Sequence, residues 1–226
     1  MRKFSTSPAA AKGSAIFGKL RVGPMKRLYK YYTPESISLA GGIPMESIFP
    51  FESADINCSG GAQFSLQRGS NLSLNYQRGD GIAGLKDWIQ RHTAQIHRRS
   101  DFATCMSVGS TDALAKIYSL LNGDSVIFDE YAYGTAVMAC ETVGRKPIGV
   151  KMDDKGMIPN ELRNQVLMAR SQGLNPDLIY VVPEAQNPTG VSMPYDRKQE
   201  IYKICEELDL IIVEDGEEDK NSCLGI

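Results

Sequence analysis

Apolar, strand-like runs and amphipathic, helix-like segments alternate along residues 81–215, and this order constrains the fold more than any other feature of the chain. The runs 178–182 and 210–213 are apolar at every position, as in strands that are buried on both faces. The segments between such runs repeat apolar residues every three or four positions, as Leu162 and Val166 do. We therefore predict an α/β fold with a mostly parallel sheet and helices on both faces.

Cap and turn signals divide this region into elements. Asp80 is a suitable N-cap for a first helix, and Asn122-Gly123 is typical of the end of a second helix, which opens after Gly109. Two further helices are expected to begin at Pro159 and Pro194, because proline is tolerated in a first helical turn. The remaining expected elements are a helix at 135–142 and strands at 125–129, 146–152, 178–182 and 210–213.

The first 80 residues differ from the rest, with turn signals at 39–44 and 49–51 and little regular periodicity. We predict that residues 1–80 form an irregular N-terminal arm and the start of a small domain. Residues 81–215 are then part of a large domain, and residues 216–226 form an atypical polar tail.

Composition argues against several classes of function. The net charge of −2 gives no indication of a nucleic-acid partner, and no apolar stretch is as long as a membrane span. The five cysteines are widely scattered and lack C-x-x-C spacing, so we predict neither a disulfide framework nor a metal site. The only histidines, His92 and His97, fall on a predicted helix, where a solvated position is expected.

Two compartments are compatible with the sequence. The lack of a disulfide pattern favours a reducing one, and we expect a cytoplasmic protein. The first 34 residues contain no Asp or Glu, however, and Met1–Ser7 is basic and rich in hydroxyls, as in a mitochondrial transit peptide. A loose basic arm is the alternative, because this opening has no clear amphipathic period.

One motif is misleading. Residues 79–84 spell G-x-G-x-x-G, and Asp101 follows at about the distance of a ribose-binding acid. A dinucleotide site requires a buried strand before the glycines and an acid at the end of the next strand. Here residues 72–76 are half polar and Asp101 precedes its strand, so we predict a loop and the start of a helix.

Polar residues follow the predicted strands where ligands bind in open α/β sheets. Ser110 and Thr111 open a helix whose free N–H groups favour an anion. Tyr133 can lay its ring on a flat cofactor, Asn187 can donate to a ring oxygen, and Asp215 can hold a ring nitrogen protonated. N-capping, a core tyrosine, a turn and a solvated acid are the ordinary alternatives. Together the five residues suit a planar, phosphorylated pyridine, and we predict pyridoxal 5'-phosphate as the cofactor.

A set of short motifs runs in consistent order from about Gly18 to Asp215. They are S-L-A-G-G-I-P at 38–44, F-P-F at 49–51, Tyr76 with Gly81-Ile82, G-S-T at 109–111, D-E-Y-A-Y at 129–133, V-P-E-A-Q-N-P-T-G at 182–190 and I-I-V-E-D at 211–215. In these motifs the sequence resembles the class I/II, fold type I aminotransferases, and within them the 2-aminoadipate, kynurenine and aromatic aminotransferase branch. The resemblance covers about the first half of a typical member.

The resemblance implies an enzyme that transfers an amino group from an amino acid to a 2-oxo acid, using pyridoxal phosphate. It implies that Ser110 and Thr111 hold the cofactor phosphate, and that Tyr133 stacks on the ring. It further implies that Asn187 bonds the phenolic oxygen and that Asp215 pairs with the pyridine nitrogen.

Two residues in the first 80 acquire roles from the same resemblance. Gly42 would line the substrate side of the site. Tyr76 would reach a cofactor phosphate in the partner subunit, because members of the family are homodimers.

The sequence departs from the family beyond Asp215. Glu218 stands where a tyrosine is usual, and no S-x-S-K-like segment supplies the Schiff-base lysine. Lys220 is a poor substitute because it lies in the polar tail and not on a separate strand-end turn. We therefore expect a truncated chain that is inactive alone. The alternatives are a non-catalytic cofactor-binding module and an inactive partner of a full-length subunit.

Overall fold

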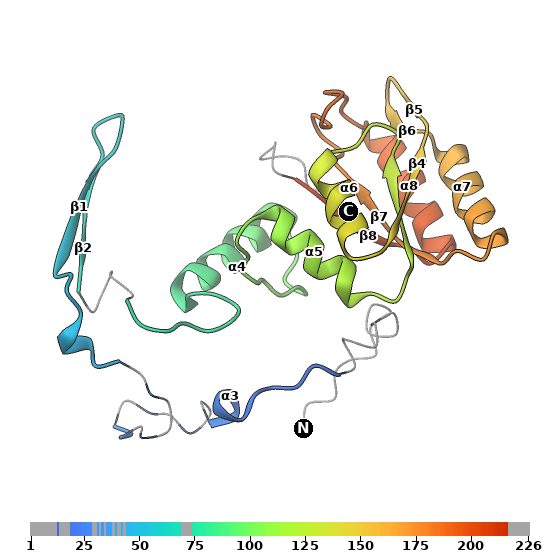
Figure 1. Cartoon of the computed structure of the whole chain (residues 1–226). Helices are drawn as coiled ribbons and strands as arrows, with labels where there is room; N and C mark the ends of the chain where they lie inside the picture. Colours follow the sequence, from blue (N-terminus) through green and yellow to red (C-terminus); the bar gives the residue numbers. More distant parts are fainter. Residues whose placement is uncertain are drawn as a thin grey trace. The chain divides into compact units, whose positions relative to one another are not determined.

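The computed structural model describes residue 13, residues 19–28, 31, 33, 35–37, 39, 42 and 44–68, and residues 74–216. The chain divides into two units (Figure 1). We call Met1–Leu20 with Trp88–Ile226 the sheet unit, and Arg21–Asp87 the hairpin unit.

The sheet unit is built on four parallel strands in the order β4-β3-β7-β8. Their bounds are Ser125–Asp129 for β3, Lys146–Val150 for β4, Pro176–Val181 for β7 and Ile211–Glu214 for β8. Every residue of the two central strands, β3 and β7, is buried, which is why these runs carry no polar alternation. The predicted parallel α/β fold is confirmed.

Helices cover both faces of this sheet. The helices α5 (Ser110–Leu120) and α6 (Gly134–Thr142) share one hydrophobic core with the sheet, and α7 (Pro159–Ser171) and α8 (Tyr195–Glu207) share another. The strands serve both cores because successive side chains point to opposite faces. Phe128 and Tyr180 face α5 and α6, whereas Ile127, Ile179 and Val181 face α7 and α8.

Two predicted helix caps are wrong. The helix α4 runs from Ala83 to His97, and Asp80 does not cap it: its carboxylate accepts hydrogen bonds from Lys86 and from Arg78 Nε, the latter at 3.0 Å. Gly123 does not end α5 as a left-handed cap either, because the C-cap is Leu121 in an extended conformation. A β-carbon at Gly123 would overlap the carboxylate of Asp177 and the guanidinium of Arg145, so close packing explains this glycine.

The strand predicted at 146–152 is also too long. β4 ends at Val150, and Met152–Asp153 forms a separate short strand, β5, that pairs antiparallel with β6 (Gly156–Met157). The predicted starts of α7 and α8 are confirmed, since Pro159 is the first residue of α7 and Pro194 is the N-cap of α8.

The hairpin unit contains a regular element that the sequence did not indicate. Strands β1 (Ser53–Asn57) and β2 (Gln63–Gln67) form an antiparallel hairpin. The hairpin escapes detection because most of its residues are exposed, so neither face has an apolar pattern. The unit also contains the short helix α3 (Pro24–Leu28) and the 3-10 turn η2 (Glu46–Ile48).

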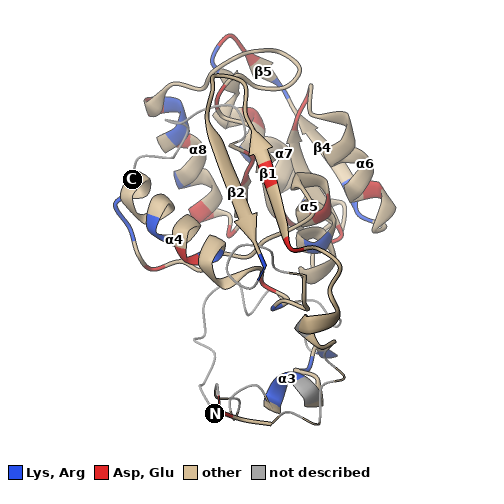
Figure 2. Cartoon of the chain, turned by 90° about the vertical axis from the view of Figure 1, so that its left-hand side faces the viewer, with Lys and Arg blue, Asp and Glu red and all other residues tan. Residues whose placement is uncertain are grey.

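Basic and acidic residues are interspersed along α4 and α8 (Figure 2). Among the residues that the structure describes, no helix is long and apolar enough to cross a membrane. The same residues contain no group of three or more His, Cys, Asp and Glu side chains that could hold a metal ion.

Candidate functional site

The carboxyl edge of the sheet is the natural place for a ligand. From β3 the chain moves outward to β4 and then returns past β3 to β7, so the strand order reverses between β3 and β7. Ligands of open α/β sheets bind at the carboxyl ends of the strands at such a reversal. Tyr133, Asn187 and Asp215 all follow carboxyl ends of these strands, as the sequence predicted.

Asp215 is held at the end of β8 by the sheet itself. Its backbone N–H donates to the Val181 carbonyl at 2.9 Å and so extends the β7–β8 ladder by one residue. Val213 is the register partner of Tyr180, and Asp215 lies two residues further on, hence on the same face as Tyr180. There the Tyr180 hydroxyl donates to Asp215 Oδ2 at 2.8 Å. The half-buried carboxylate therefore has a defined position on the α5–α6 face.

Tyr133 is the N-cap residue of α6. Its backbone carbonyl accepts from Ala136 N–H at 3.0 Å, which fixes the first turn. The side chain is half buried and packs against the core shared by α5, α6 and the sheet. Tyr133 and Asp215 thus belong to the same face of the sheet.

Ser110 and Thr111 begin α5. The N-cap is Gly109, with φ +132°, and no side chain caps the helix. The first backbone N–H groups are therefore open to an anion, and the helix dipole favours negative charge there. Ser110 is half buried and Thr111 is exposed.

A carboxylate lies in the same first turn but is neutralised locally. Asp112 accepts hydrogen bonds from Lys116 and from the backbone N–H of Val108, the latter at 3.2 Å. The Lys116 ammonium lowers the pKa of Asp112. The ion pair limits the repulsion that Asp112 would exert on a bound phosphate.

The loop after β7 contains a buried polar residue that the sequence did not indicate. Asn187 is exposed, and the neighbouring Gln186 is the buried residue, with 3% of its surface exposed. Gln186 Nε2 donates to the Tyr131 carbonyl, and Gln186 Oε1 accepts from Thr189 Oγ1 at 2.6 Å and Thr189 N at 3.0 Å. Gln186 therefore ties the Asn187 loop to the loop that leads to Tyr133. Sequence reasoning missed it, although a turn with several backbone N–H groups needs an internal acceptor.

Asp129 ends β3 beneath these loops. Only 5% of its surface is exposed, and Oδ2 accepts from Gln186 Nε2 at 3.4 Å. Oδ1 is buried without a hydrogen-bond partner among the described residues. Burial raises the pKa of Asp129 to about 6, against the opposing effect of the Gln186 hydrogen bond.

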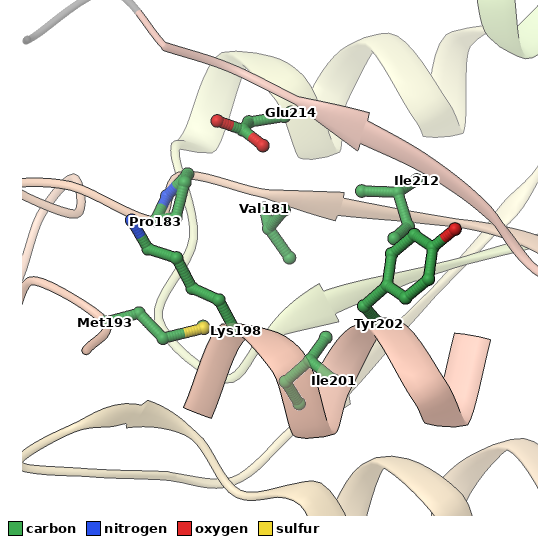
Figure 3. A pocket seen from close by; sticks show the side chains of 8 residues that line it. All are labelled: Val181, Pro183, Met193, Lys198, Ile201, Tyr202, Ile212 and Glu214. Atoms are coloured by element: carbon green, nitrogen blue, oxygen red, sulfur yellow. The ribbon is translucent and has the colours of Figure 1, made fainter. Parts of the chain in front are cut away.

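The other face of the sheet carries a small pocket that is not suited to a cofactor. Figure 3 shows its lining, mostly apolar, with Glu214 on one side and Lys198 from α8 on the other. Lys198 forms an ion pair with Glu184, and burial raises the pKa of Glu214 to about 7. The pocket volume of about 20 Å³ holds about one water molecule.

The two remaining predicted residues lie in the hairpin unit. Gly42 has φ +55°, and Tyr76 has 79% of its surface exposed. The roles of Gly42 and Tyr76 stay predictions. Glu218 and Lys220 lie outside the described residues.

Known proteins match this chain both in sequence and in fold. A sequence model of the family named aminotransferase class I and II matches residues 62–216. The bovine protein named kynurenine/alpha-aminoadipate aminotransferase, mitochondrial, is 29% identical over 94% of this chain and 53% of its own length. An aromatic amino acid aminotransferase of Dictyostelium discoideum is 33% identical over 80% of this chain and 41% of its own length.

Solved structures of aminotransferases also match the fold of this chain. The crystal structure of aminotransferase Aro8 from Candida albicans has a TM-score of 0.80 at 27% identity, covering 92% of this chain and 49% of its own. The structure of a Pyrococcus horikoshii kynurenine aminotransferase in complex with PMP has a TM-score of 0.60 at 26% identity, covering 89% and 50%. The chain spans about half the length of the relatives it matches.

Proposed function

Because the chain belongs to the class I and II aminotransferases, we propose that it takes part in amino-group transfer between an amino acid and a 2-oxo acid. We further propose that the residues at the carboxyl edge of its sheet hold pyridoxal phosphate. The observation that supports this most is that a helix N-terminus without a side-chain cap, a tyrosine and a carboxylate belong to elements on one face of the sheet.

The chemistry of these groups fits the cofactor. The N-terminus of α5, with the hydroxyls of Ser110 and Thr111, suits a phosphate. The ring of Tyr133 suits a flat pyridine, and Asn187 offers an amide donor. The carboxylate of Asp215 suits a protonated ring nitrogen, and this pairing is worth about 4 kcal/mol at 4 Å and an effective dielectric near 20.

When bound, pyridoxal phosphate supplies an electron sink for the charge left on an amino acid that loses its α-proton. In this proposal Asp215 keeps the ring nitrogen protonated, and the protonated ring stabilises the negative charge left on the amino acid. Tyr133 fixes the plane of the cofactor ring, and the N-terminus of α5 fixes its phosphate group.

We propose 2-aminoadipate, kynurenine or an aromatic amino acid as the donor. The support is the names of the relatives, which include kynurenine/alpha-aminoadipate and aromatic amino acid aminotransferases. Because we expect the chain to be inactive alone, calorimetric binding of each donor to the chain saturated with pyridoxal 5'-phosphate tests the assignment. Equal affinity for an unrelated donor such as alanine would contradict it.

We also propose a homodimer in which Tyr76 and Gly42 contribute to a site. The support is the family pattern in the sequence and the 79% exposure of Tyr76. Sedimentation of the wild-type chain measures the oligomeric state, and a monomer at all concentrations would contradict this proposal. The compartment is proposed as cytoplasmic or mitochondrial, and fusion of residues 1–34 to a fluorescent reporter decides between the two.

Binding of pyridoxal 5'-phosphate tests the central proposal. Titration of the purified chain, followed by calorimetry, should show one site, and Asp215→Ala and Tyr133→Ala should each weaken it at least tenfold. Tyr195→Ala is the matched control, since Tyr195 is exposed at the start of α8 on the other face. Equal affinity in all four proteins would overturn the proposal.

A further inference from the structure

We propose that Tyr180 is a positioning residue for Asp215. Its hydroxyl donates a hydrogen bond to Oδ2 of the carboxylate, which leaves Oδ1 to face the ring nitrogen of the cofactor. This inference rests on the proposed function, because it concerns how the carboxylate at the end of β8 is aimed.

The sheet register brings the two side chains together. Tyr180 lies opposite Val213 in the β7–β8 ladder, and the side chain two residues beyond Val213 points to the same face. The hydroxyl of a tyrosine extends well past its own Cα, so it reaches the end of the neighbouring strand. The resulting Oη–Oδ2 distance is 2.8 Å, which is a normal hydrogen bond to a carboxylate. Among the described residues, Oδ1 of Asp215 accepts no hydrogen bond from a protein group.

The Tyr180 ring is held rigidly. Only 2% of its surface is exposed, and its ring centroid lies 5.6 Å from that of Phe128. Phe128 in turn meets the ring of Tyr118 edge-on, with centroids 6.5 Å apart. A packed aromatic side chain cannot change rotamer without displacing its neighbours. The position of the hydroxyl is therefore set by the core of the α5–α6 face.

The hydroxyl also stays a donor. Burial raises the pKa of Tyr180 well above its ordinary value, and the hydrogen bond to Asp215 raises it further. The Tyr180 hydroxyl is consequently protonated at neutral pH and can donate to Oδ2. A hydrogen bond to a carboxylate is among the stronger ones in proteins, so it can fix which oxygen faces the ligand.

Tyr118 is a matched control within the same aromatic row. Only 1% of its surface is exposed, and its hydroxyl has no hydrogen-bond partner among the described residues. Tyr118→Phe and Tyr180→Phe therefore remove the same atom from equally buried rings. Only the second change removes a hydrogen bond to Asp215.

The experiment is a double-mutant cycle read by pyridoxal 5'-phosphate binding to the whole chain. Tyr180→Phe should weaken binding about tenfold, because the carboxylate loses its fixed orientation. In an Asp215→Ala background the same change should have an effect of less than twofold, since there is no carboxylate left to position. Tyr118→Phe should leave affinity within twofold of wild type. A general structural role would instead weaken binding equally in both backgrounds.

A second cycle, read by denaturant unfolding without cofactor, tests the hydrogen bond alone. Tyr180→Phe and Asp215→Ala should be coupled, with a departure from additivity of about tenfold in the unfolding constant. Failure of the wild-type chain to bind cofactor overturns the proposed function and this inference with it. Wild-type binding together with an unaffected Tyr180→Phe variant, or with additive effects in the two cycles, overturns this inference alone.

Discussion

The side-chain amide of Gln186 donates a hydrogen bond to Asp129 Oδ2 at 3.4 Å, across the ends of the two central strands β7 and β3. Both side chains are buried. The same amide nitrogen donates to the Tyr131 carbonyl, so Gln186 connects the loops that carry Asn187 and Tyr133. The two central strand ends are therefore joined by side chains as well as by the sheet.

Asp129 should make stability depend on pH. Its folded-state pKa is about 6, above the ordinary value near 4, so the folded state holds its proton more tightly. Asp129 therefore adds about 3 kcal/mol to the free energy of unfolding below about pH 4, and this stabilisation is lost as the pH rises toward 6 and beyond. Asp129→Asn should make this decline shallower in denaturant unfolding measured from pH 4 to 7, and the half-buried carboxyl of Glu214, whose pKa is raised to about 7, accounts for the decline that remains. Asp101→Asn, at an exposed acid whose pKa Arg99 lowers, should leave the decline unchanged.

Gln186→Ala should destabilise the chain by about 2 to 4 kcal/mol, because it leaves the Thr189 N–H and the Tyr131 carbonyl without their partner. It should also weaken binding of pyridoxal 5'-phosphate, since the loops that carry Tyr133 and Asn187 come apart. Urea unfolding and calorimetric titration measure the two effects. Gln199→Ala, on the exposed side of α8, should change stability by about 0.5 kcal/mol or less; similar values for both variants would argue against the bridging role.

Gly123→Ala should be severely destabilising, by about 3 kcal/mol or more. The added carbon would overlap the buried Arg145–Asp177 ion pair, in which Asp177 Oδ2 also accepts from Gly123 N–H at 2.6 Å, and disrupting a buried pair is costly. The control is Gly84→Ala in α4, where nothing lies within 4 Å of the added carbon. That change should be neutral or should stabilise by up to about 1 kcal/mol. Thermal unfolding of both variants compares them directly.

Tyr133 should act through its ring and not through its hydroxyl. Tyr133→Phe should retain most of the affinity for pyridoxal 5'-phosphate, whereas Tyr133→Ala should lose at least about 1.4 kcal/mol of binding free energy, which is the tenfold weakening expected above, together with the stacking surface. Tyr131→Ala, at an exposed neighbour, should have little effect. If the phenylalanine variant bound as weakly as the alanine variant, the stacking role would be wrong.

The sequence alone determined the order and type of the helices and of the four parallel strands in the sheet unit, but not the β5–β6 pair. The buried runs at β3 and β7 and the helical spacing of Leu162, Val166 and Ala169 are visible because burial on both faces, or on one helical face, leaves an apolar pattern. The run at β8 is equally apolar, although its residues are only half buried. The same pattern placed Tyr133, Asn187 and Asp215 at strand ends, where a parallel sheet gathers them. The strand predicted before Ser110 is wrong, because α5 follows α4 with no strand in the described residues between them.

Only the tertiary structure decided which side chains meet. Nothing local in the sequence shows that Tyr180 bonds Asp215 or that Gln186 reaches Tyr131, since 35 and 55 residues separate the partners. The sequence does not show why residue 123 is a glycine. The structure does, because the side chains of Asp177 and Arg145 pack against it and leave no room for a β-carbon. The prediction that Asp80 caps α4 followed an ordinary capping rule, and it was wrong because Arg78 and Lys86 bind the carboxylate instead. The apolar periodicity of a sequence indicates which residues are buried. Which buried side chains contact each other depends on strand order and register, and long-range packing sets both.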